Sequence, residues 1–199
     1  MAIKDGKLIE ATYQPTPNHG GPLKDPQYII VHYTAGRSAG SSARWLCDPK
    51  SRASAHLIIG RDCTLIQLCS FGTVAWHAGE SEWKGLHGLN KFSIGVELDN
   101  PGLVSRVNGR WRSLTLGIDY PDSDVVEAPH PRGGPVRGWV LYSPAQLQML
   151  EDICRELVAE YPTIQDALGH WEIAPGRKLD PGGAFELDVF RSRLFGRAD

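Results

Sequence analysis

Gly-His-Trp-Glu-Ile-Ala-Pro-Gly-Arg-Lys-Leu-Asp-Pro-Gly-Gly-Ala-Phe (residues 169–185) places an imidazole, an ammonium group and a carboxylate in one segment, at His170, Lys178 and Asp180. The prolines and glycines keep most of this segment from forming a helix. His170 and Asp180 could bind one metal ion together, because Zn²⁺ accepts nitrogen and carboxylate oxygen and a hydrolytic zinc site keeps one position open for water. From these residues alone, a surface loop with turn-forming residues is an equally good interpretation.

The bulk composition indicates an ordinary globular protein. The 199 residues suffice for one domain, with or without a large insertion. A net charge of −2, with no run rich in Lys or Arg, gives no sign of a nucleic-acid partner. The first residues lack the apolar core of a signal peptide, and no apolar run could span a membrane. We therefore expect a cytoplasmic monomer without membrane insertion, released, if at all, by a phage-type or dedicated secretion route.

The four cysteines do not form a CxxC pair. Without an export signal, we expect reduced and mostly buried thiols, and we assign none of them to a metal site. They are Cys47, Cys63, Cys69 and Cys154.

Two apolar segments predict strands that are buried on both faces. Tyr28–Tyr33 is β-branched and aromatic, and it carries His32 near its end. A core histidine bonded to a neighbouring carbonyl is the structural alternative to a functional role. In Phe92–Leu98, Glu97 lies among apolar neighbours, where a carboxylate is unfavourable unless it is paired, protonated or functional. An ion pair would be the plain explanation.

A hairpin and a loop lie between these strands. Ser54–Ile59 and Thr64–Leu68 predict the hairpin, and for His56 in its first strand we favour a structural role over metal ligation. The Gly-rich loop that follows carries aromatic, imidazole and amide groups, which suit a polar substrate with faces to stack on. A loop anchored by tryptophan for structural reasons explains each of these residues equally well. The candidate substrate contacts are Trp76, His77 and Asn90.

Two further segments have no clear periodicity. Residues 1–26 are rich in Pro and Gly and predict an extended arm that wraps around the domain. Residues 101–140 change in character, and a structureless loop of this length would be unusual in a compact domain. We expect an insertion near the mouth of the site, with a short hairpin, and a solvent-exposed His130.

Three helices are predicted. The clearest has Ser143 as N-cap, Pro144 in the first turn and Gln146 completing a capping box, and it ends at Pro162. A short helix in Ser38–Asp48 is expected to turn Trp45 and Leu46 inward. A third, Ala184–Leu194, is expected to bury Phe185, Val189, Phe190 and Leu194.

Assembled in order, these segments resemble the zinc-dependent N-acetylmuramoyl-L-alanine amidases, a family that also contains peptidoglycan recognition proteins. The terminal segment is most similar to cytoplasmic amidases that recycle anhydro-muropeptides and to related phage and bacterial enzymes. Together the matching segments cover most of the chain outside the arm and the insertion. They are Ile29–Thr34, Ser54–Ile59, Ala75–Gly79, Asn90–Leu98 and Gly169–Phe185.

The resemblance implies an α/β domain with a central mixed sheet flanked by helices, and a zinc ion held by His32, His170 and Asp180. It implies hydrolysis of the amide bond between N-acetylmuramic acid, or its anhydro form, and the L-alanine of the peptidoglycan stem peptide. Glu97 would take a proton from the zinc-activated water and pass it to the leaving amine, and Lys178 would stabilise the oxyanion. Peptidoglycan or muropeptide fragments are the implied partners. Arg177 could contact a stem-peptide carboxylate, although a surface charge explains it equally well.

Two features depart from the family pattern. Cys63 lies in the hairpin turn where a glycine is usual, and the 101–140 insertion is longer than in the compact recycling enzymes. The insertion leaves open whether the substrate is a soluble anhydro-muropeptide or polymeric cell wall. A non-catalytic peptidoglycan-binding module is the main alternative, and the presence of Glu97 and Lys178 argues against it. A helical zinc peptidase is disfavoured because the sequence contains no HExxH, whereas cleavage within the stem peptide stays open.

Overall fold

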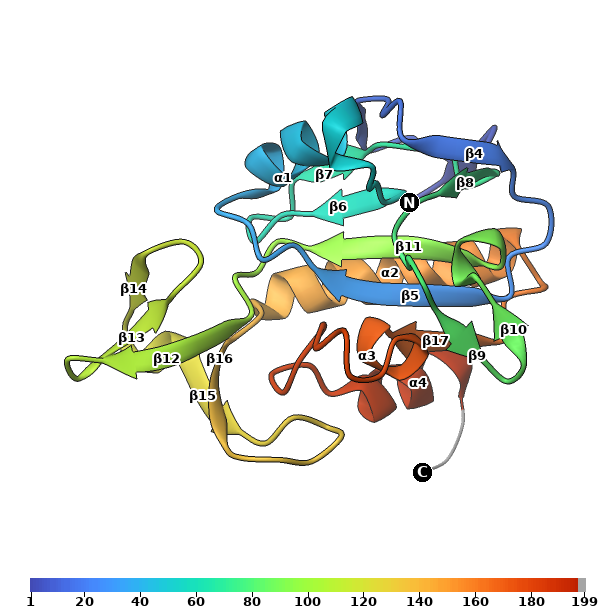
Figure 1. The fold of residues 1–199 in the computed structure, drawn as a ribbon. Helices are drawn as coiled ribbons and strands as arrows, with labels where there is room; N and C mark the ends of the chain where they lie inside the picture. Colours follow the sequence, from blue (N-terminus) through green and yellow to red (C-terminus); the bar gives the residue numbers. More distant parts are fainter. Residues whose placement is uncertain (197–199) are drawn as a thin grey trace.

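A six-stranded mixed sheet forms the centre of the computed structural model, which describes residues 1–196 (Figure 1). The strand order is β17 (Asp166–Gly169), β5 (Tyr28–Tyr33), β11 (Ser93–Leu98), β6 (Leu57–Ile59), β7 (Leu65–Gln67) and β3 (Thr12–Tyr13). The first four strands run parallel to one another. β7 is antiparallel to β6, and β3 is parallel to β7.

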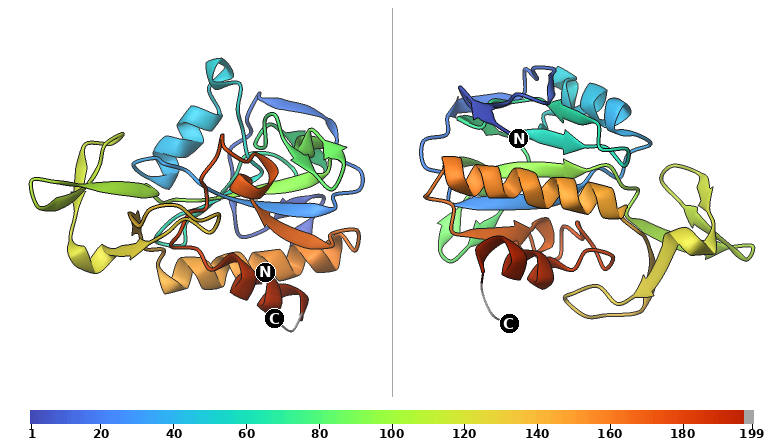
Figure 2. Two further views of the ribbon diagram at one scale, coloured as in Figure 1. Left: turned by 60° about the horizontal axis from the view of Figure 1, so that its bottom comes forward. Right: turned by 180° about the vertical axis from the view of Figure 1, so that it is seen from behind.

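Alternate residues of the central strands face opposite sides of the sheet. Ile29 and Val31 belong to the main apolar cluster, together with residues of α2 (Pro144–Glu160) and α4 (Leu187–Phe195). Figure 2 shows α2 lying along the back of the sheet. Ile30 packs on the opposite side of the sheet, with Ala78 and Leu168. His32, two residues after Ile30, therefore points away from α2, to the side on which Ile30 packs.

The helices α1 (Ala39–Leu46) and α3 (His170–Ile173) lie on that second side. A capping box between Ser38 and Ser41 starts α1, in which each side chain bonds the backbone of the other residue. The expectation that Trp45 turns inward is wrong, since it is 62% exposed. The buried stripe of α1 runs through Ala39, Ala43 and Leu46, and Trp45 lies off this stripe.

A second, five-stranded antiparallel sheet projects from the main body (Figure 1). We call Leu103–Val140 the projecting sheet. A short hairpin was expected in this segment, which instead forms a sheet of five strands. Its strands are short, and opposite charges pair across them, as between Arg112 and Asp119, so the sequence shows no apolar alternation. The strand order is β14 (Ile118–Tyr120), β13 (Arg110–Ser113), β12 (Leu103–Val107), β16 (Arg137–Val140) and β15 (Val125–Ala128).

Short elements complete the described chain. Two-stranded antiparallel pairs are formed by β1 (Ile3–Lys4) with β2 (Lys7–Leu8), β4 (His19–Pro22) with β8 (Thr73–Ala75), and β9 (Glu82–Trp83) with β10 (Leu86–His87). Three turns are 3₁₀-helical: η1 (Pro49–Ser51), η2 (Leu89–Lys91) and η3 (Asp122–Asp124).

The predicted helices need two corrections at their ends. Ser143 caps α2 as expected, but Gln146 does not complete a capping box, because its side-chain amide donates to the carbonyls of Ile59 and Asp99. α4 begins at Leu187, not at residue 184. Phe185 is buried ahead of the helix, whereas Val189 is 37% exposed and lies off the stripe of buried residues.

Within residues 1–196, the helices are too short or too polar for one of them to cross a bilayer. All four cysteines are free thiols: Cys69 and Cys154 are buried, and Cys47 and Cys63 are half-buried. Cys63 has a φ of 65°, the left-handed conformation that glycine adopts most easily, which explains why a glycine is usual at this turn.

Candidate active site

Three polar side chains meet at the carboxyl ends of adjacent parallel strands. Glu97 of β11 is in register with His32 of β5, and Gly169 of β17 is in register with Val31. His170, the next residue, therefore stands beside His32. The carboxyl end of a parallel sheet is where α/β folds commonly bind ligands, because loops leave all the strands at this edge.

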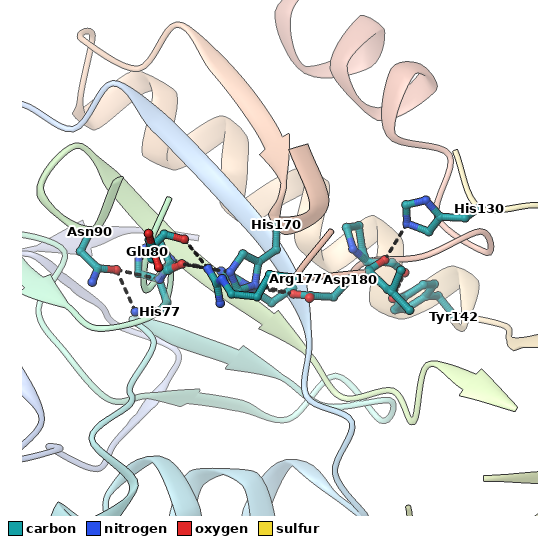
Figure 3. Close-up of polar contacts among 12 residues, drawn as sticks. His77, Glu80, Asn90, His130, Tyr142, His170, Arg177 and Asp180 are labelled. Carbon is teal, nitrogen blue, oxygen red and sulfur yellow. Dashed lines mark hydrogen bonds and ion pairs between the residues drawn. The ribbon is translucent and has the colours of Figure 1, made fainter. Parts of the chain in front are cut away.

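His32, His170 and Asp180 form a tight triangle of possible ligand atoms. The Nδ1 atoms of the two histidines are 2.9 Å apart, and each lies 2.9 Å from Oδ2 of Asp180. All three residues are buried. Asp180 reaches the site from the loop after α3, where its carbonyl accepts a hydrogen bond from the backbone N–H of Trp171 at 3.0 Å. Figure 3 shows His170 and Asp180 side by side.

Hydrogen bonds on the outer sides of the two rings determine which nitrogen atoms face the triangle. Nε2 of His170 lies 3.2 Å from the carbonyl oxygen of Ala78, which can only accept, so Nε2 carries the proton. Nε2 of His32 lies 3.1 Å from Nδ1 of His77, and Nε2 of His77 lies 3.4 Å from the carbonyl of Ser93. This second chain of contacts is satisfied when Nε2 of His32 is also the donor. Both Nδ1 atoms of the neutral rings then present lone pairs to the Asp180 carboxylate, a donor set that fits a divalent cation such as Zn²⁺.

The two acidic groups of the site differ in electrostatic environment. Burial, together with the nearby charge of Asp180, raises the pKa of Glu97 to about 8. Its Oε2 atom is buried and has no hydrogen-bond partner in the described chain. Asp180, by contrast, lies against the two Nδ1 atoms, where a bound cation would keep its carboxylate ionised. Burial lowers the pKa of His32 to about 4, which favours the neutral ring that a metal ligand needs.

A cavity of about 670 Å³ opens in front of these groups. It is lined by the metal-ligand triangle, Glu97 and Lys178. Lys178 is half-buried, and among residues 1–196 its Nζ atom has no ion-pair or hydrogen-bond partner. Its charge acts on Glu97 only at longer range, where it partly offsets the raised pKa of that carboxyl, so the ammonium group remains available to a substrate or to developing negative charge.

The four expected substrate contacts occupy different positions. Trp76 is exposed and lines the cavity, whereas His77 is buried against His32 at its inner wall. Asn90 does not line this cavity, and its Oδ1 atom accepts from the backbone N–H groups of His77 and Ala78 (Figure 3). Arg177 lines the cavity, and its guanidinium donates to the carbonyls of Ala78 and Glu80.

Some residues at the cavity were not singled out from the sequence. Trp45 lines it from α1, and Thr115 lines it from the projecting sheet. Trp45 was expected to turn inward, and its position off the stripe of Ala39, Ala43 and Leu46 was the available signal against that expectation. Nothing in the sequence indicated that Thr115 lies near the site.

Two further histidines are structural. His56 is fully buried; its Nδ1 accepts from the N–H of Gly95, and its Nε2 donates to the carbonyl of Thr73, as favoured from the sequence. The expectation that His130 is exposed is wrong: only 8% of it is exposed, and it packs against Trp139 and Trp171. The long 101–140 segment folds back onto the main body at this point, a contact that sequence patterns do not show.

Comparison with known proteins agrees with this geometry. Residues 22–183 match the N-acetylmuramoyl-L-alanine amidase family. The 1,6-anhydro-N-acetylmuramyl-L-alanine amidase AmpD of Salmonella typhimurium strain SL1344 is 30% identical to this chain, with 96% of this chain and 94% of the relative aligned. The chain belongs to the N-acetylmuramoyl-L-alanine amidase family.

Two solved structures extend this similarity to the whole described fold. The crystal structure of a selenomethionine derivative of AmpD has a TM-score of 0.71 and 28% identity, covering 98% of this chain and 99% of that one. AmiD of E. coli, in complex with its substrate anhydro-N-acetylmuramic acid-L-Ala-D-γ-Glu-L-Lys, has a TM-score of 0.62 and 26% identity, covering 96% of this chain and 65% of that one. The predicted family, enzyme class and mixed α/β fold are confirmed.

Proposed function

We propose that this protein hydrolyses the amide bond between anhydro-N-acetylmuramic acid and the L-alanine of a stem peptide, with Zn²⁺ held by His32, His170 and Asp180. The observation that carries this proposal is the convergence of two Nδ1 lone pairs and a carboxylate within hydrogen-bond distance of one another. Without a cation, three atoms that all accept hydrogen bonds would face one another in a buried site, which is unfavourable.

The proposed roles of the other residues follow from their positions. Bound zinc would supply a Lewis acid that acidifies water and polarises the amide carbonyl. Glu97, with its buried and unpartnered Oε2, accepts a proton from the attacking water and delivers it to the leaving nitrogen. A nearby cation favours the ionised form of this carboxyl, so that it can act as a base near neutral pH.

Lys178 is suited to stabilise negative charge on the amide oxygen, because its ammonium group lines the cavity and forms no close ion pair in the described chain. A well-placed donor of this kind contributes about 3 kcal/mol to the stability of the transition state. Trp45 and Trp76 line the cavity and offer aromatic faces to the sugar or peptide.

A soluble muropeptide is the substrate that we favour. The aligned relative is named for the 1,6-anhydro form of the substrate, and the AmiD complex contains an anhydro-muramyl tripeptide. The monomeric state and the cytoplasmic location stay predictions.

The proposal is tested by mass spectrometry of digests of a soluble anhydro-muropeptide and of purified sacculi. The zinc-loaded protein should release an intact stem peptide that begins at L-alanine, and chelation should abolish release. Glu97→Gln should lower turnover by about 10²- to 10⁴-fold, because it cannot accept the proton. Glu160→Gln, an exposed change at the end of α2, is the matched control and should cleave normally.

Preference between the two substrates would distinguish a recycling enzyme from a lytic one. A wild-type protein that retains zinc and binds fragments, yet cleaves neither substrate, would contradict the amidase proposal and support the non-catalytic binding module.

A further inference from the structure

A second cavity, of about 230 Å³, lies between the projecting sheet and the loop that carries Asp180. Its wall includes Arg132 and Arg137 on one side and Lys178 and Leu179 on the other. Lys178 and Leu179 also line the active-site cavity. The two cavities are therefore neighbours, separated by the residue that we place next to the scissile amide.

The second cavity is positively charged. No Asp or Glu lines it, and neither Arg132 nor Arg137 has an ion-pair partner in the part of the chain that the structure describes. The other arginines of the projecting sheet differ in this respect, since each is paired with a carboxylate: Arg106 with Asp122, and Arg110 and Arg112 with Asp119. Both arginines without an ion pair therefore line the cavity next to the active site, and Arg137 also lines a separate cavity with Glu127.

The base of the Arg132 loop is fixed in place. Nδ1 of His130 accepts from the backbone N–H of Arg132, and Nε2 of His130 lies 3.0 Å from the carbonyl of Leu179. The ring of Trp139 packs so closely on Gly182 that a Cβ atom there would lie 2.6 Å from it. These contacts join the projecting sheet to the segment that carries Lys178 and Asp180, so the backbone that carries the two exposed arginines is held near the site before any ligand binds.

We propose that Arg132 and Arg137 form a subsite for the carboxylates of the stem peptide. This inference rests on the proposed amidase function. In the tripeptide L-Ala-D-γ-Glu-L-Lys, linkage through the γ-carboxyl leaves the α-carboxylate of the glutamate free, and the terminal lysine carries a second carboxylate. Both follow the scissile amide by one or two residues. Guanidinium groups bind carboxylates through paired, charge-assisted hydrogen bonds, and Lys178 lies between this subsite and the reacting bond.

The test uses three anhydro-muramyl tripeptides: one with both carboxylates free, one with the glutamyl α-carboxylate converted to a carboxamide, and one with the terminal carboxylate converted. Each is assayed for kcat/KM with the zinc-loaded wild type, with Arg132→Gln/Arg137→Gln, and with Arg110→Gln as the matched control. Wild type should cleave at least one carboxamide about tenfold more slowly than the free acid, which shows which carboxylate binds. The double variant should cleave the free acid and that carboxamide at the same, lower rate, and the control should behave as wild type.

The outcomes separate this inference from the proposed function. Equal kcat/KM on all three substrates, in wild type and double variant alike, would overturn the subsite and leave the amidase intact. An equal loss on all three substrates in the double variant would also overturn it, by indicating a general structural effect. Absence of cleavage by wild type would count against the proposed function itself.

Discussion

The hydrogen bonds of two imidazole rings decide what His32 and His170 can bind. Each ring has its Nε2 atom against a neighbour from the 77–78 segment, which leaves both Nδ1 atoms facing Asp180. The sequence could nominate these histidines, and the family resemblance could group them. It could not assign the nitrogen, because the tautomer depends on neighbours brought in by folding. Folding also places His77, which was expected as a substrate contact, against the ring of His32.

Replacement of His77 tests this positioning role. His77→Phe retains an aromatic ring but removes the acceptor for Nε2 of His32, and zinc affinity should fall by about 10- to 100-fold, as for other outer partners of metal ligands. His77→Asn keeps an acceptor oxygen near the position of Nδ1 and should recover part of the affinity. Chelator competition measures both variants, with circular dichroism as the check of folding. Wild-type zinc affinity in a folded His77→Phe protein would contradict the role.

The buried His56 should make stability depend on pH. Its pKa is lowered from 6.5 to about 4 by burial, so the unfolded chain binds a proton at a higher pH than the folded one. The contribution of His56 is therefore complete above pH 6.5 and is lost as pH falls from there towards 4. Between pH 7 and 5 the loss is about 2 kcal/mol.

Urea unfolding of chelated protein at the two pH values measures this loss. In His56→Gln the difference in unfolding free energy between pH 7 and pH 5 should shrink by about that amount. His87→Gln, which changes an exposed histidine, should retain the full difference. If His56→Gln keeps the wild-type pH dependence, another group is responsible.

At the level of elements, the sequence predicted the helices whose ends and buried faces depend on residues close together in the chain. The Ser143 cap, the apolar stripe and Pro162 sufficed to find α2, because capping and helical periodicity act within a few residues. For the projecting sheet, the sequence predicted only a short hairpin. Its strands pair with segments that are distant in the sequence, and oppositely charged side chains form ion pairs across the strands, so no apolar alternation marks them. Parallel register, which sets Glu97 beside His32, likewise has no signature in either strand alone.

One glycine in β11 shows how closely these elements approach each other. A Cβ atom on Gly95 would lie 2.4 Å from the ring of His77, so Gly95→Ala must displace that ring. We expect a loss of about 1–3 kcal/mol in unfolding free energy, as for other overpacked cores, together with weaker zinc binding. Gly40→Ala is the control, since its nearest neighbour would be the end of the Arg44 side chain at 3.8 Å, and alanine in a helix should stabilise by about 0.5–1 kcal/mol. Thermal unfolding of both variants tests the contrast, which would fail if Gly95→Ala were as stable as wild type.

At the scale of the whole molecule, the candidate metal site joins distant parts of the chain. His32 lies in β5, whereas His170 and Asp180 follow the last strand of the main sheet. No spacing rule connects residues so far apart, and only the resemblance to a family grouped them before the fold was known. Since the projecting sheet packs on the Asp180 loop, an ion in this site would stabilise three regions at once.

Metal removal should therefore lower the stability of the entire fold. Zinc at about 1,000 times its dissociation constant contributes about 4 kcal/mol if the unfolded chain does not bind it. For a protein of this size, about 2–4 °C per kcal/mol predicts that chelation lowers Tm by roughly 8–16 °C. Differential scanning calorimetry with zinc and with chelator measures the shift.

Two variants test whether the zinc-dependent shift in Tm comes from an ion at this site. Asp180→Ala should lose most of the zinc-dependent shift, because it removes a ligand. Glu97→Gln should retain the shift while losing turnover, since Glu97 lies outside the triangle of ligand atoms. A wild-type Tm that is the same with and without zinc would contradict a bound ion at this site. A shift that persists in Asp180→Ala would place the ion elsewhere, and the amide hydrolysis would then need a different metal centre.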